Sequence, residues 1–203
     1  MNKNSILTES LFLFVKYGIK SITMDDVARE LQISKKTLYQ IVEDKKDLVE
    51  KTTLLFTQRD RHALLSIVNE HKHVIDQLIY LCKQSSNLVR NQNPVFLFDL
   101  KRYYLNGWKI YREYKVTGYY NLIYHTIQKG IEEGFYRDNI NLDIVSKFYI
   151  SQIEMITNQD LFPSTKYIFE NVMNEFLTCF IYGISTTKGK KYVNRLISAD
   201  VLR

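Results

Sequence analysis

Residues 21–39 read SITMDDVARELQISKKTLY, and they decide the fold of the N-terminal part of the chain. The spacing of the apolar residues between positions 24 and 41 is typical of two helices that are joined by a tight turn and bury one face each in a small shared core. These residues are Val27, Ala28, Leu31, Ile33, Leu38 and Ile41. Thr23 and Ser34 are the residues that cap these helices at their N-termini, and acids follow Thr23 at the positive end of its helix. The stretch predicts a helix-turn-helix.

The outer face of the second predicted helix is polar. It carries Lys35, Lys36, Thr37, Tyr39 and Gln40. Ammonium, hydroxyl and amide groups are those that bind phosphates and base edges in a major groove, so this face predicts a DNA-binding surface. The alternative is a helical hairpin whose charged face is only solvated, because a pair of surface lysines is usually just exposed.

Helices on both sides complete a small three-helix head. In residues 5–17, Leu7, Leu11, Phe14 and Val15 recur at helical spacing and predict a first helix. Gly18 is placed to end this helix as a left-handed cap. Asp44 caps a fourth helix, which begins at Lys45 and continues toward Val68. We expect a helix-turn-helix DNA-binding domain at residues 1–48 and a larger helical domain at residues 49–203.

The rest of the chain also favours helices. Apolar residues recur three or four apart in residues 74–88, 95–104, 110–131, 144–156 and 167–184. Asn93-Pro94 is typical of a helix start, and Asn106-Gly107 and Gly134 are interpreted as stops. The predicted fold class is all-α, a three-helix head joined to a larger helical domain.

The stretch at residues 21–39 resembles the signature of the TetR family of bacterial transcriptional regulators. Its flanks, residues 11–18 and 44–48, match as well, so the resemblance covers about the first quarter of the chain. Residues 130–137 and 182–189 also resemble segments of family members, although less diagnostically. The resemblance implies a ligand-responsive DNA-binding regulator, most often a repressor that leaves its operator when a small molecule binds.

The resemblance also implies roles for individual residues. Thr23, Tyr39 and Lys45 would hold backbone phosphates, which suits the free amides of helix N-termini. Lys35, Lys36, Thr37 and Gln40 would face the groove, and the N-cap residue Ser34 completes the expected DNA-binding set.

The sequence departs from the family at three places. Gln32 stands where glycine is usual, so a strained or altered turn is expected there. Lys36 also replaces a frequent glycine, and Gln40-Ile41-Val42 stand where His-Tyr-Phe-like residues are common. These departures bear on the operator sequence rather than on DNA binding.

The larger domain has an unusual density of aromatic residues between positions 103 and 124. Large rings with polar tips can wall a small-molecule pocket, and the resemblance places an effector pocket in this domain. The candidate lining residues are Tyr104, Trp108, Tyr111 and Tyr124. The alternative is that these rings pack the helices together.

The last long predicted helix is apolar over a broad sector. One stripe is Ile168, Val172, Phe176 and Phe180, and a second is Phe169, Met173, Leu177, Ile181 and Ile184. Such a helix contacts more than one neighbour, either within the monomer or in a two-fold interface. The resemblance favours a homodimer that binds a palindromic operator on double-stranded DNA.

Charge adds little to this interpretation. The 203 residues carry a formal net charge of +6, with a pI of about 9.1. Residues 1–60 hold ten Lys and Arg against nine Asp and Glu, so the head is nearly neutral. A helical interaction protein that has lost DNA binding is therefore a competing hypothesis.

An enzyme is the other competing class, and the sequence gives it little support. The four histidines and two cysteines have no zinc-ligand spacing, and no nucleotide-binding glycine loop or Gly-x-Ser-x-Gly elbow occurs. We expect no enzymatic activity, no cofactor and no metal. Cys82 and Cys179 are interpreted as reduced core thiols of a cytoplasmic protein, and no apolar run is long enough to predict a membrane span.

Overall fold

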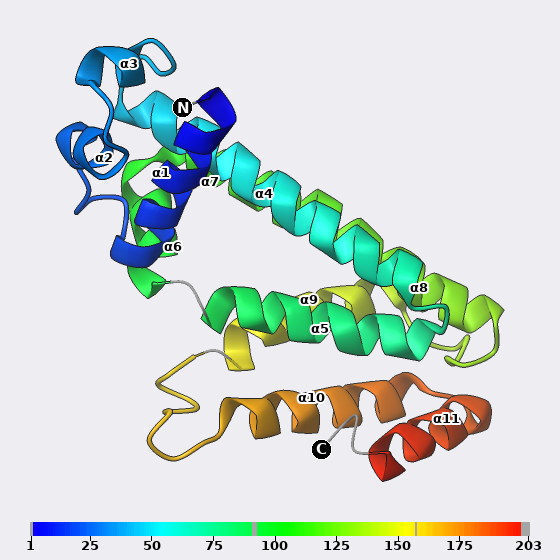
Figure 1. The fold of residues 1–203 in the computed structure, drawn as a ribbon. Coiled ribbons are helices and arrows are strands. Elements are labelled where there is room, and N and C mark those ends of the chain that lie inside the picture. The colour runs from blue at the N-terminus through cyan, green and yellow to red at the C-terminus, as the bar shows by residue number, and fades with distance from the viewer. Residues whose placement is uncertain (1, 91–92, 157, 200–203) are drawn as a thin grey trace. The chain divides into compact units, whose positions relative to one another are not determined.

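The computed structural model describes residues 2–90, 93–156 and 158–199, and the regular elements of these residues are helices (Figure 1). In chain order they are α1 (Lys3–Tyr17), α2 (Met24–Glu30), α3 (Lys35–Tyr39), α4 (Lys45–Glu70), α5 (Val74–Arg90), α6 (Pro94–Tyr103), α7 (Leu105–Glu113), the π-helix η1 (Tyr114–Tyr119), α8 (Tyr120–Glu132), α9 (Leu142–Ile156), α10 (Phe169–Ile184) and α11 (Thr187–Ser198). The all-α prediction is confirmed.

The chain forms two compact units. The first comprises Met1–Ala63 and Asn91–Thr117, and the second comprises Leu64–Arg90 and Gly118–Arg203. Helix α4 contributes residues to both units. The functional boundary after residue 48 stays a prediction, because compactness alone does not assign DNA or effector binding.

The helix starts of the first unit follow the predicted caps. Asn93 accepts a hydrogen bond from the Val95 amide at 2.9 Å and is followed by proline at the start of α6. Asp44 accepts one from the Asp47 amide at 2.8 Å at the start of α4. These side chains satisfy amides that a helix leaves unpaired in its first turn.

Two predicted helix ends in this unit differ from the structure. Gly107 lies inside α7 rather than ending a helix. A Cβ there would meet Leu100 Cδ1 at 2.8 Å and Thr53 Oγ1 at 3.3 Å, so this glycine permits close packing of α7 on α6 and α4. The second helix of the motif was expected to reach Ile41, but α3 ends at Tyr39.

The second unit is built around α5, α8, α9 and α10. Helix α8 packs on α5 and α9, while α10 packs on α5, α9 and α11. The segments at 130–137 and 182–189 meet here, because Tyr136 and Ser185 form an antiparallel bridge. A Cβ at Gly130 would lie 2.1 Å from the Tyr136 ring, so glycine is required for this contact.

The two cysteines have different environments. Cys82 is fully buried in α5, as predicted, and burial raises its pKa to about 12. Cys179 is exposed on α10, so its prediction as a core residue is wrong. It lies one turn from Phe176 on the outer side of α10, a position that apolar spacing alone does not separate from the inner side. Among the described residues, no helix is both long and apolar enough to cross a membrane.

The turn between α2 and α3 predicts a stabilising substitution. Gln32 has φ of 53°, the left-handed conformation that glycine adopts without a steric penalty. We expect Gln32→Gly to raise the free energy of unfolding by up to about 1 kcal/mol, measured by urea denaturation. Gly134→Ala is the control and should lower the free energy of unfolding, because Gly134 has φ of 74° while open space around it rules out a steric clash. A less stable Gln32→Gly protein would contradict the prediction.

Candidate nucleic-acid interface

Helix α3 is held by one cap and one buried side chain. The Ser34 hydroxyl accepts the Thr37 amide hydrogen at 3.0 Å, and the two hydroxyls lie 2.8 Å apart. Leu38 is fully buried on the inner side of the helix. Figure 1 shows α3 beside α2 at the edge of the first unit, and the two helices are in contact. This arrangement leaves the outer face of α3 open.

The polar residues of α3 are exposed to different degrees. Lys36 and Gln40 are exposed, Tyr39 is 49% exposed and Thr37 is half-buried. Lys36 and Gln40 lie one turn apart, so they share a side of the helix. An ammonium and an amide on one open side can reach a phosphate or a base edge.

Lys35 is held by an ion pair with α2. Its Nζ lies 2.6 Å from Asp25 Oδ1, and both side chains are more than half exposed. The hydrogen bond to Asp25 raises the pKa of Lys35. An exposed pair of this kind is weak, so it does not prevent the lysine from contacting an anion.

The N-terminus of α2 has a complete capping box. Thr23 Oγ1 accepts the Asp26 amide hydrogen at 3.1 Å, and Asp26 Oδ2 accepts hydrogen bonds from the Thr23 amide and hydroxyl. The hydrogen bonds from Thr23 lower the pKa of Asp26, with Arg29 adding a smaller effect. The Thr23 hydroxyl therefore serves the cap, in addition to the phosphate role expected for it.

Lys45 is partly enclosed at the start of α4. Its Nζ donates a hydrogen bond to the Lys20 carbonyl at 3.5 Å and lies 5.8 Å from the Tyr104 ring centre. Burial lowers its pKa, although Asp99 and Asp26 act in the opposite direction. The ammonium group is thus directed toward the loop between α1 and α2.

Sequence reasoning missed two side chains that support the head. Asp99 of α6 is buried, and its Oδ2 accepts the Lys20 amide hydrogen at 2.7 Å. Asn93 donates a hydrogen bond to the Lys16 carbonyl at 3.1 Å. Both contacts join residues almost 80 positions apart in the chain. The Asn93-Pro94 pair indicates a helix start, but nothing in the sequence indicates that Asn93 also donates a hydrogen bond to the Lys16 carbonyl.

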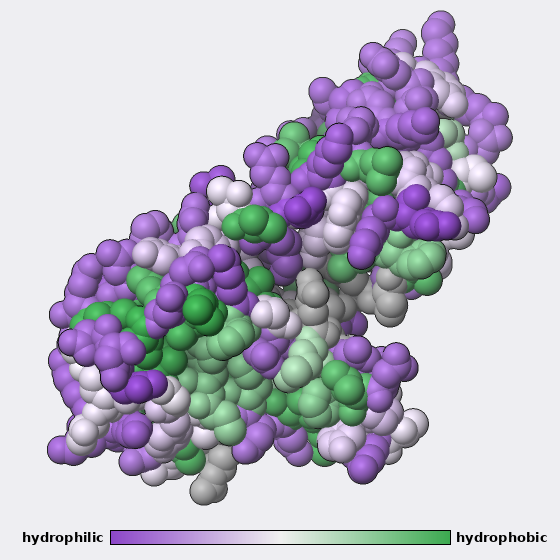
Figure 2. All heavy atoms as spheres, turned by 180° about the vertical axis from the view of Figure 1, so that it is seen from behind, coloured by the Kyte–Doolittle hydropathy of each residue, from purple (hydrophilic) through white to green (hydrophobic). Residues whose placement is uncertain are grey.

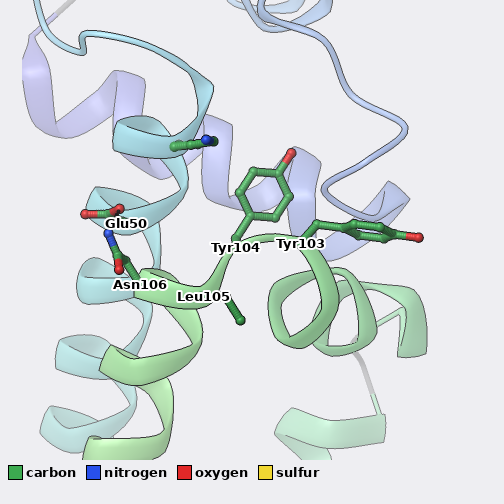
Figure 3. A pocket seen from close by; sticks show the side chains of 6 residues that line it. Glu50, Tyr103, Tyr104, Leu105 and Asn106 are labelled. Carbon is green, nitrogen blue, oxygen red and sulfur yellow. Dashed lines mark hydrogen bonds between the residues drawn. The ribbon is translucent and has the colours of Figure 1, made fainter.

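The four aromatic candidates for an effector pocket do not form one cluster. Tyr104 lines a pocket of about 220 Å³ in the first unit, where its ring points away from that of Tyr103 (Figure 3). Trp108 and Tyr111 contact each other at 5.6 Å between ring centres. Tyr124 belongs to the second unit and contacts Tyr120 at 5.7 Å. Their role in ligand binding stays a prediction.

The pocket at Tyr104 lies where α4 approaches the junction of α6 and α7. Asn106 donates a hydrogen bond to Glu50 at 2.9 Å across this approach. Lys46 and Leu105 complete the lining with Tyr103. The lining is polar and close to the helix-turn-helix, which distinguishes it from an apolar cavity for an effector.

The second unit has a broad apolar surface, visible in Figure 2. Most of the second predicted stripe is buried, namely Met173, Leu177, Ile181 and Ile184, while Phe169 at the start of α10 is half-buried. In the first stripe Ile168, just before α10, is exposed, and Val172, Phe176 and Phe180 are half-buried. Helix α9 adds Ile144, Phe148 and Met155, which are exposed by 46%, 58% and 39%. A cavity of about 460 Å³ opens on this surface between Met155 and Phe176. Patches of this kind mark contact surfaces in other proteins.

Comparison with known proteins places the helix-turn-helix in a family. Residues 6–52 match the family described as bacterial regulatory proteins, tetR family. The match includes all the residues predicted to bind DNA. No curated protein matches the chain.

Solved structures of regulators share the whole fold. A regulator from Saccharomonospora viridis in complex with choline has a TM-score of 0.78 at 18% identity, over 91% of this chain and 97% of that one. A TetR-family regulator from Cytophaga hutchinsonii has a TM-score of 0.76 at 16% identity, over 92% and 96%. FadR from Bacillus subtilis in complex with stearoyl-CoA has a TM-score of 0.73 at 15% identity, over 90% and 100%. At these identities the likeness establishes the fold.

The capping box of α2 predicts a loss of stability on mutation. Thr23→Ala removes the acceptor for the Asp26 amide, and we expect the free energy of unfolding at neutral pH to fall by about 1 kcal/mol. The pKa of Asp26 is below its ordinary 3.8 in the folded chain, so its stabilising effect is present above pH 3.8 and is lost as the pH falls further. The difference from the wild type should therefore shrink in acid. Urea denaturation measures both effects, with Thr165→Ala, at an exposed threonine, as the control. Equal stability of Thr23→Ala and wild type at neutral pH would contradict the prediction.

Proposed function

We propose that the chain is a transcriptional regulator of the TetR family, a homodimeric repressor that binds a palindromic operator and releases it when a small molecule binds. The observation that carries the proposal is the capped α3, whose outer face presents Lys36, Tyr39 and Gln40 within the segment that matches the family. In this proposal α3 enters the major groove of double-stranded DNA.

The proposed contacts divide into two kinds. Lys35, Lys36, Thr37 and Gln40 face the groove, while Tyr39 binds a backbone phosphate. Thr23, Ser34 and Lys45 stand at helix N-termini, where free amides and a cation favour a phosphate. Phosphate contacts position the protein and base contacts select the sequence, so Lys36 and Gln40 are the proposed determinants of the operator.

The proposed dimer uses the apolar surface of α9 and α10. Exposed Phe148 and Ile168, with half-buried Phe176, leave apolar area that a second copy of the same two helices can cover. A two-fold pairing of α9 and α10 forms a four-helix interface and sets the two heads for half-sites about one helical turn, or a multiple, apart.

The proposed effector is a small molecule bound by the larger helical domain at residues 49–203. Support comes from the structural neighbours, since one was solved with choline and another with stearoyl-CoA. Helix α4 has residues in both compact units, so it can transmit a change between the effector and the head. A coupling free energy of about 1–3 kcal/mol suffices to change operator occupancy.

The proposal places the protein in the cytoplasm, where the DNA is, and assigns it no catalytic step. A helical interaction protein without DNA binding is the competing hypothesis, favoured by the near-neutral head and by the pairing of Lys35 with Asp25. Direct measurement of DNA binding decides between the two.

DNA binding is tested with a labelled fragment from upstream of the protein's own gene. We expect fluorescence polarisation to show binding that exceeds binding to a random duplex and weakens as salt rises. Lys36→Ala should weaken binding to this fragment by about tenfold or more and change binding to the random duplex much less, because a contact that selects the sequence is lost. Lys190→Ala changes an exposed lysine of α11 and should leave both unchanged. Binding of this fragment no tighter than that of the random duplex would contradict the proposal, and no binding of either duplex would favour the interaction protein.

The dimer is tested by placing a charge on its proposed surface. Phe148→Glu should convert the dimer into a monomer in analytical ultracentrifugation, because a carboxylate is costly to bury in an apolar interface. Operator affinity should fall by at least about tenfold, since one head alone loses the second half-site. Phe98→Glu is the matched control, because Phe98 is 60% exposed on α6 in the first unit. A dimer that survives Phe148→Glu would place the interface elsewhere.

A further inference from the structure

Asp60 is a buried carboxylate with only one of its oxygens paired. It lies in α4, in the first unit, and is 8% exposed. Its Oδ2 accepts a hydrogen bond from the Tyr114 hydroxyl at 2.7 Å. Its Oδ1 is buried without a hydrogen-bond partner among the described residues. One acceptor is therefore available to a donor that does not belong to these parts of the chain.

The burial of Asp60 is unfavourable in this structure. Desolvation raises the pKa of Asp60, while the hydrogen bond from Tyr114 and the charge of Lys115 lower it less. A buried acceptor that lacks a donor costs stability. Groups of this kind call for an explanation, and a bound donor removes the cost.

The carboxylate stands beside an aromatic cluster. Phe56 lies one turn earlier on α4, and its ring centre is 5.9 Å from that of Phe96 and 6.3 Å from that of Tyr111. Tyr111 and Tyr114 follow each other by about one turn, so Phe56 and Asp60 of α4 meet two tyrosines of the opposite segment. Aromatic faces attract a cation that a carboxylate also binds.

The local backbone adds a second sign of specialisation. Tyr114 is the first residue of η1, the π-helix between α7 and α8. A π-helical turn is less favourable than an α-helical one and occurs frequently at functional sites. The Tyr114 hydroxyl meets Asp60 at the start of this turn.

We propose that Asp60 receives the protonated amine of an organic ligand, whose apolar part contacts the rings of Phe56 and Tyr111. This inference rests on the proposed effector response and names the chemical class of the effector. The ammonium group donates a charge-assisted hydrogen bond to Oδ1, and Tyr114 holds Oδ2 in place. A carboxylate ligand is repelled at this position, and an alcohol satisfies the acceptor but leaves its charge unbalanced.

Three probes of one skeleton test this proposal at neutral pH: protonated 2-phenylethylamine, 2-phenylethanol and phenylacetate. Binding is measured by calorimetry and by the fluorescence of Trp108, the one tryptophan in the sequence, whose ring centre is 5.6 Å from that of Tyr111. We expect the full-length protein to bind the amine at least about tenfold more tightly than the alcohol, and the acid most weakly.

Asp60→Asn is the decisive variant, because asparagine keeps the shape and an acceptor for Tyr114 but removes the charge. The preference for the amine should fall at least about tenfold, to the level of the alcohol. Asp143→Asn is the matched control. Asp143 also accepts a tyrosine hydroxyl, from Tyr120 at 2.7 Å, but its second oxygen is paired with Lys147 at 2.8 Å. Circular dichroism checks that both variants are folded.

Three outcomes would overturn the proposal: unchanged amine binding by Asp60→Asn, a preference of the wild type for the alcohol or the acid, or no binding of any probe. Each can occur while the ligand-free wild type binds its operator, so the regulator function would stand. Conversely, if the proposed regulator function is wrong, the ligand-free wild type fails to bind its operator in the DNA assay, in which no probe is present. The two failures are therefore distinguishable.

Discussion

The burial of Leu38 holds α3 in place, since a helix of five residues makes too few hydrogen bonds to persist alone. Val27 and Ala28 of α2, the helix that contacts α3, are also buried. The Ser34 hydroxyl accepts a hydrogen bond from the Thr37 amide, so the cap fixes the start of α3 while Leu38 fixes its inner side. Every polar residue proposed to bind DNA from α3 takes its direction from this one contact, because the helix has no other buried side chain among residues 35–39.

The head in turn depends on α6. Gly18 has φ of 83°, and a Cβ there would meet Val95 Cγ1 at 2.9 Å, so the end of α1 approaches α6 closely. Close to this contact, Asp99 of α6 accepts a hydrogen bond from the Lys20 amide. A three-helix head has a small core, and these contacts explain why the first compact unit includes α6 and α7. A shift of α6 would act directly on the loop that leads into α2.

The parts of the fold that could be predicted are those determined by neighbours in sequence. The caps at Thr23, Ser34, Asp44 and Asn93 are bonds across two or three residues, so residue type and spacing suffice. The positive φ of Gln32 was expected from the resemblance, because glycine is usual at this position in the family. The ion pair of Lys35 with Asp25 depends on how α2 and α3 cross, which no local pattern encodes.

The larger domain shows the same limit. Both stripes of α10 are equally apolar in sequence, and only the packing of α5 and α9 decides that Leu177 is buried and Ile168 exposed. At Gly107 a helix stop was predicted where close packing of α7 is the actual requirement, because asparagine before glycine is compatible with both. The pairing of Asp60 with Tyr114 joins residues 54 positions apart, so it is invisible to spacing arguments.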